Sequence, residues 1–223
     1  MSVRVAVLAS GGGSNLQAIL DYFDALGDQQ AASVALIASD RASSGTLERA
    51  RRRGVPGMAL DATQRTSGLA GILDAHGIDV IALAGYLRFV PVDVTRKWRG
   101  RILNVHPSLL PSFGGEGMYG MRVHQAVISS GTRISGATVH FVNEEYDRGP
   151  IIAQWPVPVF PDDTPEALAA RVLAAEHRLF PAAVDAVARR RVTLGDDGRV
   201  RGWTIPAAGP TTFSLISTDH TTS

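Results

Sequence analysis

Hydrophobic and polar positions follow two rhythms along the first half of the chain. Short apolar runs rich in β-branched residues predict buried strands, at residues 3–9, 33–39, 55–60, 78–84 and 101–105. Between them, apolar residues recur every three or four positions, which predicts amphipathic helices, near residues 16–23, 45–53 and 67–76. This alternation predicts an α/β fold: a doubly wound, mostly parallel sheet of about seven strands with helices on both faces.

The second half of the chain has a different pattern. Residues 136–142 and 151–157 are apolar runs joined by a polar loop, so we expect some antiparallel strands in this half. Residues 165–188 have a long helical pattern, in which Pro181 predicts a kink or a restart. The segment 192–201, with its two glycines, predicts a small hairpin.

The composition indicates one domain without a strong electrostatic field. The chain has 223 residues, a formal net charge of +1 and 45% hydrophobic residues. We expect a single domain over residues 1–202, followed by a loosely held tail at 203–223 that is rich in Ser, Thr and Pro. The near-neutral charge favours neither nucleic acid nor an anionic membrane as a partner. The oligomeric state is open between a monomer and a homodimer.

The residue inventory removes several kinds of chemistry. The sequence has no cysteine, which excludes disulfides, thiolate nucleophiles and cysteine-ligated metals, and its six histidines show no zinc-binding spacing. We therefore expect no metal. No apolar run approaches the roughly 20 residues that span a bilayer, and no signal-peptide pattern opens the chain, so the expected compartment is the cytoplasm.

A glycine-rich loop, ASGGGSN at residues 9–15, separates the first predicted strand from the first helix. Glycines allow close backbone approach, and free N–H groups at a helix N-terminus attract anions, so the loop predicts a phosphate site. Ser14 and Gln17 have the spacing of a capping box, and a tight turn with an ordinary cap is the alternative. Leu16 stands at the third glycine position of a dinucleotide fingerprint, which disfavours that reading, although Asp40 could serve as a ribose-binding acid or be a solvated loop residue.

Two polar residues mark the end of a predicted central strand. Asn104 and His106 share one face because side chains alternate along a strand, and Pro107 ends the strand directly after them. Open α/β sheets carry their active sites at such ends. An amide beside an imidazole can donate hydrogen bonds to an oxygen that gains negative charge, and the imidazole can carry a proton. The alternative is a structural histidine in a turn.

Two carboxylates complete the candidate chemistry. Asp147 lies in the polar loop 142–150, where the following Gly-Pro pair predicts a fixed turn; a carboxylate near His106 would raise the pKa of the ring and orient it. A solvated acidic hairpin is the alternative. Glu176 lies in an apolar helical stripe and therefore needs a partner, either a ligand amine or hydroxyl or a structural arginine.

Four segments in this order resemble the folate-dependent formyltransferases, and in particular those that act on glycinamide ribonucleotide: SGGGSN (10–15), AGYLR (84–88), NVHPSLLP (104–111) and YDRGP (146–150). The resemblance implies a Rossmann-like formyltransferase fold. It also implies transfer of formyl from 10-formyltetrahydrofolate, a cosubstrate, to the amine of glycinamide ribonucleotide in de novo purine (IMP) biosynthesis. Neither a metal nor a tightly bound cofactor is implied.

The resemblance assigns roles to individual residues. The catalytic residues are Asn104, His106 and Asp147, with protonated His106 and Asn104 stabilising the oxyanion. The residues that bind the nucleotide substrate are Gly12, Gly13, Ser14, Asn15 and Glu176. The residues at the folate site are Arg65, Leu87, Arg88, Phe89, Val90, Asn104, Asn143, Glu144, Tyr146 and Asp147.

Two departures and two alternatives accompany this assignment. Leu173 stands where many relatives have a lysine, and the glycine-rich loop at 112–120, longer than in many members, is predicted to be a mobile flap. Within the same class, the chain could be a 10-formyltetrahydrofolate deformylase or another folate-dependent formyltransferase. From a different class, it could be a non-catalytic nucleotide-binding α/β module or a dehydrogenase.

Overall fold

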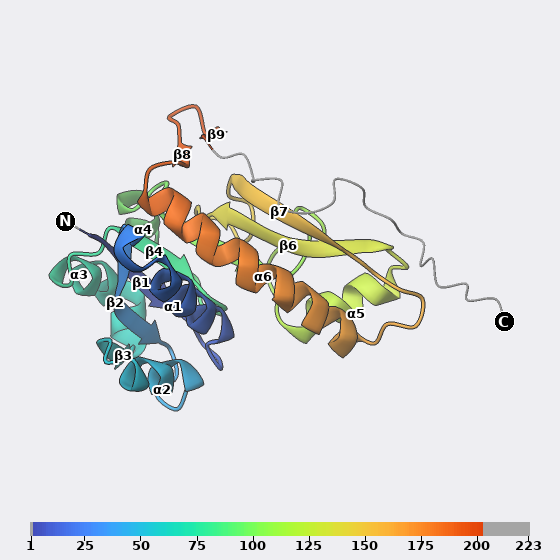
Figure 1. Ribbon diagram of the computed structural model, residues 1–223, viewed down its shortest axis with the longest axis horizontal. Helices are drawn as coiled ribbons and strands as arrows, with labels where there is room; N and C mark the ends of the chain where they lie inside the picture. Colours follow the sequence, from blue (N-terminus) through green and yellow to red (C-terminus); the bar gives the residue numbers. More distant parts are fainter. Residues whose placement is uncertain (1, 203–223) are drawn as a thin grey trace.

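A seven-stranded sheet forms the centre of the computed structural model, which describes residues 2–202 (Figure 1). Its strand order is β3-β2-β1-β4-β5-β6-β7. The strands are β1 (Val3–Leu8), β2 (Ala32–Ser39), β3 (Gly57–Ala59), β4 (Val80–Leu83), β5 (Ile102–His106), β6 (Ile134–Phe141) and β7 (Ile151–Pro158). Pairs among β1–β5 are parallel, whereas β5–β6 and β6–β7 are antiparallel. The predicted fold class is confirmed.

Alternating side chains of the buried strands build two separate cores. In β1, Val5 and Val7 join one cluster while Ala6 and Leu8 join the other. The first cluster packs under α1 (Ser14–Leu26), α5 (Met121–Ser129) and α6 (Pro165–Ala188); the second packs under α3 (Leu69–Ala75) and α4 (Val92–Lys97). In Figure 1, α1 and α6 lie side by side across one face of the sheet. Strands buried on both faces explain the continuous apolar runs of the sequence.

Several helix boundaries differ from the prediction. The capping box at Ser14 is wrong: α1 is preceded by Gly13 in the left-handed conformation (φ 74°), and no side chain caps the helix. Pro181 does not restart the helix, because α6 is one element of 24 residues that contains Pro181 and is capped by Thr164, while the predicted kink stays a prediction. The short helices α4 and α5 were not predicted. The predicted hairpin at 192–201 is confirmed: β8 (Thr193–Leu194) pairs antiparallel with β9 (Val200–Arg201).

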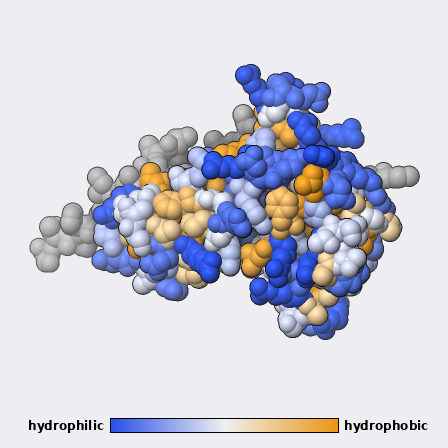
Figure 2. All heavy atoms as spheres, turned by 180° about the vertical axis from the view of Figure 1, so that it is seen from behind, coloured by the Kyte–Doolittle hydropathy of each residue, from blue (hydrophilic) through white to orange (hydrophobic). Residues whose placement is uncertain are grey.

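The remaining elements are small. Helix α2 (Gly45–Arg52) packs beside β2 and β3, a 3-10 turn (Gly27–Gln29) follows α1, and a π-helical turn (Gln64–Gly68) precedes α3. The predicted tail at 203–223 lies outside the described residues, so the domain boundary stays a prediction. In the described part of the chain, no helix has the length and apolarity needed to cross a membrane. On the face opposite α1 and α6, hydrophobic patches are interspersed with hydrophilic side chains (Figure 2).

The topology fixes where a ligand can bind. From β1, the chain continues to β2 and β3 on one side, and then returns to place β4 and β5 on the other. The carboxyl ends of β1 and β4 therefore border a crevice, because their outgoing connections leave in opposite directions. The glycine loop follows β1, residues 84–90 follow β4, and His106 ends β5. All three predicted motifs lie at this edge of the sheet.

Gly136 offers a direct test of the packing between β6 and β7. A Cβ at this position would lie 2.2 Å from the Trp155 carbonyl oxygen and 2.6 Å from Leu109 Cδ2. We expect Gly136→Ala to lower the free energy of unfolding by about 1–3 kcal/mol or more, as overpacked cores do. The matched control is Gly71→Ala, since Gly71 is an exposed residue of α3 with open space around its Cβ position.

Urea denaturation of both variants checks this expectation. The control, Gly71→Ala, should raise the free energy of unfolding by roughly 0.5–1 kcal/mol, because alanine has a higher helix propensity than glycine. Equal effects of the two substitutions would contradict the close contact between β6 and β7.

Candidate active site

A cleft of about 690 Å³ opens at the carboxyl ends of β1, β4 and β5. It is the meeting place of most of the residues that the sequence singled out. The predicted residues that line it are Asn15, Leu87, Arg88, Phe89, Val90, Asn104, His106, Asn143, Tyr146, Asp147 and Glu176. The loop at 115–122 and the residues Leu173 and His124 also line it.

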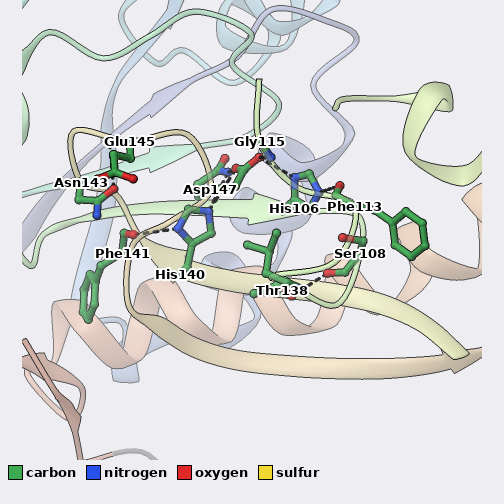
Figure 3. A network of polar contacts seen from close by, with 12 residues as sticks. His106, Ser108, Phe113, Gly115, Thr138, His140, Phe141, Asn143, Glu145 and Asp147 are labelled. Atoms are coloured by element: carbon green, nitrogen blue, oxygen red, sulfur yellow. Dashed lines mark hydrogen bonds and ion pairs between the residues drawn. The ribbon is translucent and has the colours of Figure 1, made fainter. Parts of the chain in front are cut away.

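The Asn104 amide, the His106 imidazole and the Asp147 carboxylate converge in this cleft. Figure 3 shows the His106 and His140 rings beside Asp147. Asn104 Nδ2 lies 3.4 Å from Asp147 Oδ1, and His106 Nδ1 lies 3.4 Å from Asp147 Oδ2. Asp147 also accepts a hydrogen bond of 2.9 Å from the Gly115 N–H. His106 is 3% exposed, so its ring works in a largely water-free environment. Asn104 Nδ2 and His106 Nδ1 thus point to one place, and their contacts with Asp147 are long enough for another oxygen to compete.

The tautomer of His106 follows from its neighbours. Its Nε2 lies 2.8 Å from the Phe113 carbonyl oxygen, which can only accept, so Nε2 carries a hydrogen. In the neutral ring, Nδ1 is then the bare nitrogen, and it faces Asp147. A proton that arrives at His106 is therefore received at Nδ1, where the carboxylate stabilises the imidazolium.

Burial lowers the pKa of His106 below its ordinary value, and the opposing effects of Asp147 and the Phe113 carbonyl do not make up for it. The nearby His140 ring lowers it further. Asp147 does raise the pKa of His106, as the sequence predicts, but loss of hydration outweighs the effect of one charge at 3.4 Å. The free ring is neutral at neutral pH and can accept a proton.

Asp147 remains ionised in spite of its burial. Desolvation alone would raise the pKa of this carboxyl group, but the His140 ring, the charge that His106 carries when protonated, and the Gly115 N–H lower it below its ordinary value. A charged acceptor therefore lies beside His106 Nδ1 at neutral pH.

His140 belongs to the same network and was missed at the sequence level. Its Nδ1 lies 2.8 Å from the Phe141 carbonyl oxygen, so Nδ1 carries the hydrogen, and its bare Nε2 accepts from Asn104 Nδ2 at 3.1 Å. The antiparallel register places His140 directly opposite Asn104. One N–H of the Asn104 amide is thereby fixed, which orients the second toward Asp147. The sequence signal that could have revealed His140 is a polar histidine within an apolar predicted strand. The signal was not sufficient, because the residue that lies opposite His140 depends on the pairing register.

Unusual backbone conformations hold the groups around His106. Phe113 and Asp147 both have positive φ values, 56° and 53°, in the left-handed region that side chains with a Cβ rarely adopt. At Gly149, an added Cβ would lie 1.7 Å from the Phe141 carbonyl oxygen. The Gly-Pro turn after Asp147 is therefore held tightly against β6, in line with the fixed turn that the sequence predicts.

Within residues 2–202, Glu176 is paired with an amide and not with an arginine. Its carboxylate is 6% exposed and accepts a 2.7 Å hydrogen bond from Asn15 Nδ2. Burial raises the pKa of Glu176 to about 7, which the Asn15 hydrogen bond only partly opposes. Asn15 Oδ1 is also buried and has no partner among the described residues. A carboxylate and an orphaned amide oxygen side by side leave room for a ligand that donates hydrogen bonds.

The glycine loop presents free donors. None of the backbone N–H groups of residues 11–16 finds an acceptor in the described chain. The carbonyls of Gly11, Gly12 and Gly13 are all engaged, by Thr46, Arg49 and the Gln17 N–H respectively. Gly12, Gly13 and Ser14 do not line the cleft themselves, but they lead directly into Asn15, which does. The loop has the pattern of an anion site at a helix N-terminus.

Three acidic or basic residues that the sequence analysis named are not part of the cleft wall. Arg65 donates to the carbonyls of Asp40 and Leu60 and is not part of the cleft wall. Glu144 points to Arg96, with 3.5 Å between their charged groups, instead of lining the cleft. The Asp40 side chain is buried in an ion pair of 2.7 Å with Arg88, so it is neither a solvated loop residue nor free to bind a ribose.

The outer wall of the cleft is apolar and partly exposed. The rings of Phe89 and Tyr146 meet edge to face, with centroids 5.2 Å apart, and Leu87 lies in the same lining. Each of these side chains is about two fifths exposed. Such a surface suits a flat aromatic ligand. The loop 112–120 covers part of the cleft and contributes Gly115 to Asp147, while its predicted mobility stays a prediction.

No group of three or more histidine, aspartate or glutamate side chains could hold a metal ion within residues 2–202.

Comparison with known proteins agrees with this geometry. Residues 3–184 match the formyl transferase family. A chloroplastic phosphoribosylglycinamide formyltransferase of Arabidopsis thaliana is 43% identical over 203 residues, which cover 87% of this chain and 68% of that protein. The crystal structure of a glycinamide ribonucleotide transformylase from Symbiobacterium toebii has a TM-score of 0.81 and 41% identity, over 91% of this chain and 95% of that one.

A more distant structure shows how far the fold alone extends. A formyltetrahydrofolate deformylase from Pseudomonas syringae gives a TM-score of 0.80 at 24% identity, covering 92% of this chain and 67% of that one.

The match over residues 3–184 shows that the chain belongs to the formyl transferase family. Its relatives at 41% and 43% identity place it in the phosphoribosylglycinamide formyltransferase branch.

The burial of Glu176 predicts a pH-dependent stability. Because the fold raises the pKa of Glu176 from 4.5 to about 7, the folded state favours the protonated acid, and stability is lost as the pH rises from 4.5 through 7. Glu176→Gln does not titrate. We therefore compare the free energy of unfolding of Glu176→Gln with that of the native chain. The difference between them should shift by about 3 kcal/mol in favour of the variant between pH 4.5 and pH 8.

Denaturant titrations at several pH values measure this difference. Glu166→Gln, at an exposed position in the first turn of the same helix, is the control and should show no comparable gain. A constant difference between Glu176→Gln and the native chain across the pH range would disprove the buried-acid account.

Proposed function

We propose that this chain transfers the formyl group of 10-formyltetrahydrofolate to the amine of glycinamide ribonucleotide, giving formylglycinamide ribonucleotide and tetrahydrofolate in de novo purine biosynthesis. The observation that carries the proposal is the convergence of Asn104, His106 and Asp147 at the strand ends of a formyl transferase fold. The names of the relatives from Arabidopsis thaliana and Symbiobacterium toebii support the substrate.

The proposed reaction begins with attack of the substrate amine on the formyl carbon. The C–N bond forms, the carbonyl oxygen becomes an oxyanion, and the amine nitrogen gains a positive charge. Bare Nδ1 of neutral His106 accepts the proton that this nitrogen must lose. The resulting imidazolium and the Asn104 Nδ2–H stabilise the oxyanion, since both donors point to one place and hold only long contacts there.

Collapse of the intermediate completes the transfer. The carbonyl re-forms, the bond to N10 of the folate breaks, and His106 Nδ1 returns the proton to the leaving nitrogen. Asp147 keeps the ring oriented and stabilises its charged state between the two proton transfers. The lowered pKa of His106 suits this cycle, because the free enzyme presents a base and the intermediate creates the acid.

Two sets of contacts are proposed for the two substrates. The phosphate of the nucleotide binds to the free N–H groups of the loop at 11–16. Other polar groups of the nucleotide reach Asn15 and Glu176. The folate lies against the apolar wall of Leu87, Phe89 and Tyr146, next to Arg88, Val90 and Asn143. We expect a monomer or a homodimer, and a cytoplasmic location, although the Arabidopsis relative is chloroplastic.

The decisive experiment is an absorbance assay for tetrahydrofolate release from 10-formyltetrahydrofolate, with and without glycinamide ribonucleotide. Release that requires the nucleotide supports the proposal. Release at the same rate without it, with free formate as product, would identify a deformylase. No release under either condition would leave only a binding module.

Removal of either oxyanion donor should be severe. We expect Asn104→Ala and His106→Ala to lower kcat by about 10²–10³-fold, because each removes one hydrogen bond to the developing charge. Steady-state kinetics with both substrates measure the effect, and unchanged melting temperatures would show that folding is intact. Near-normal turnover in both variants would refute the assignment.

A further inference from the structure

The carbonyl side of the glycine loop is held by one face of α2. Thr46 and Arg49 lie one helical turn apart and both reach the loop. Thr46 donates to the Gly11 carbonyl through Oγ1 at 2.9 Å and through its N–H at 3.2 Å. Arg49 Nε donates to the Gly12 carbonyl at 2.8 Å. Two consecutive peptide units are thereby fixed with their oxygens toward α2.

Arg49 also ties the loop to the first turn of α1. Its Nη1 donates to Gln17 Oε1 at 2.8 Å, so one guanidinium bridges α2, the loop and α1. Between these contacts, Gly13 adopts φ 74°, and a Cβ there would lie 3.0 Å from Thr46 Oγ1 and 3.2 Å from Arg49 Cδ. The arginine therefore packs directly on the residue that turns the chain into the helix.

The opposite side of the same peptides carries the unsatisfied donors. The N–H groups of residues 11–16 have no acceptor in the described chain, and the buried Asn15 Oδ1 beside them has no partner either. Asn15 is 8% exposed and lines the cleft. Orphaned groups of this kind at one helix end point to a ligand that is bound there.

We propose that Arg49 is a positioning residue for the nucleotide phosphate. It fixes the loop carbonyls on the α2 side, which leaves the N–H groups directed at the ligand, and its half-buried charge adds to the positive helix end. Among the described residues, Arg49 is the cation whose side chain hydrogen-bonds to this loop. Helix α6 contributes no cation to the cleft wall, because its lining residues are Ala169, Ala170, Leu173 and Glu176. The inference rests on the proposed function.

The test compares Arg49→Gln and Arg49→Lys with the native chain. We expect Arg49→Gln to raise both the KM and the calorimetric Kd for glycinamide ribonucleotide by about 10- to 100-fold. The kcat should change by less than about threefold, and the KM for 10-formyltetrahydrofolate by less than about twofold, because the oxyanion site is separate. Arg49→Lys should recover part of the affinity, since it keeps the charge but cannot form both hydrogen bonds.

Arg51→Gln is the matched control, because Arg51 lies on the same helix, is exposed and, in the described part of the chain, pairs only with Glu48. It should leave the Kd unchanged. The inference fails if Arg49→Gln binds the nucleotide as the native chain does, or if both KM values, kcat and the melting temperature worsen together. Either result, obtained while the native chain formylates the nucleotide, leaves the proposed function intact. A native chain that neither binds nor formylates glycinamide ribonucleotide would overturn both.

Discussion

The structure depends on an ionised carboxylate held inside the protein. Asp147 accepts the Gly115 N–H and lies between Asn104 and His106, so its charge orders a strand end, a loop and an imidazole at once. Taking a carboxylate out of water is costly unless donors surround it. The positive φ of Asp147 and the tight packing of Gly149 show that the backbone is constrained to meet this requirement.

The sheet topology provides the frame for that carboxylate. Parallel strands β1, β4 and β5 end at one edge, and the antiparallel return of β6 places His140 opposite Asn104. The loop between β6 and β7 then carries Asp147 back over the same edge. Phosphate, amine and formyl sites are therefore expected on consecutive loops of one rigid sheet, which suits a reaction that must hold two substrates in contact.

Much of this arrangement could be predicted from the sequence, because periodicity reports burial. The period of two placed Asn104 and His106 on one face, and the period near 3.6 placed Glu176 in an apolar stripe. The short helices α4 and α5, of six and nine residues, were missed because few apolar repeats fit into them.

Features that depend on contacts between distant segments could not be predicted from the sequence. The position of His140 needs the β5–β6 register, and the burial of Asp40 needs Arg88, 48 residues away. The directions of Arg65 and Glu144 are likewise set by nearby carbonyls and by Arg96. The pKa of His106 shows the same limit, since desolvation is a property of the whole fold.

The most direct measurement of the central claim is an NMR titration of the His106 ring in 15N-histidine-labelled protein, with His106→Ala to assign the signal. Since Asp147 supports the imidazolium against the effect of burial, the account predicts a His106 pKa below the ordinary histidine value in the native chain. The pKa should fall further in Asp147→Asn, with Nδ1 as the titrating nitrogen. A pKa that stays unchanged or rises in the variant would contradict the account.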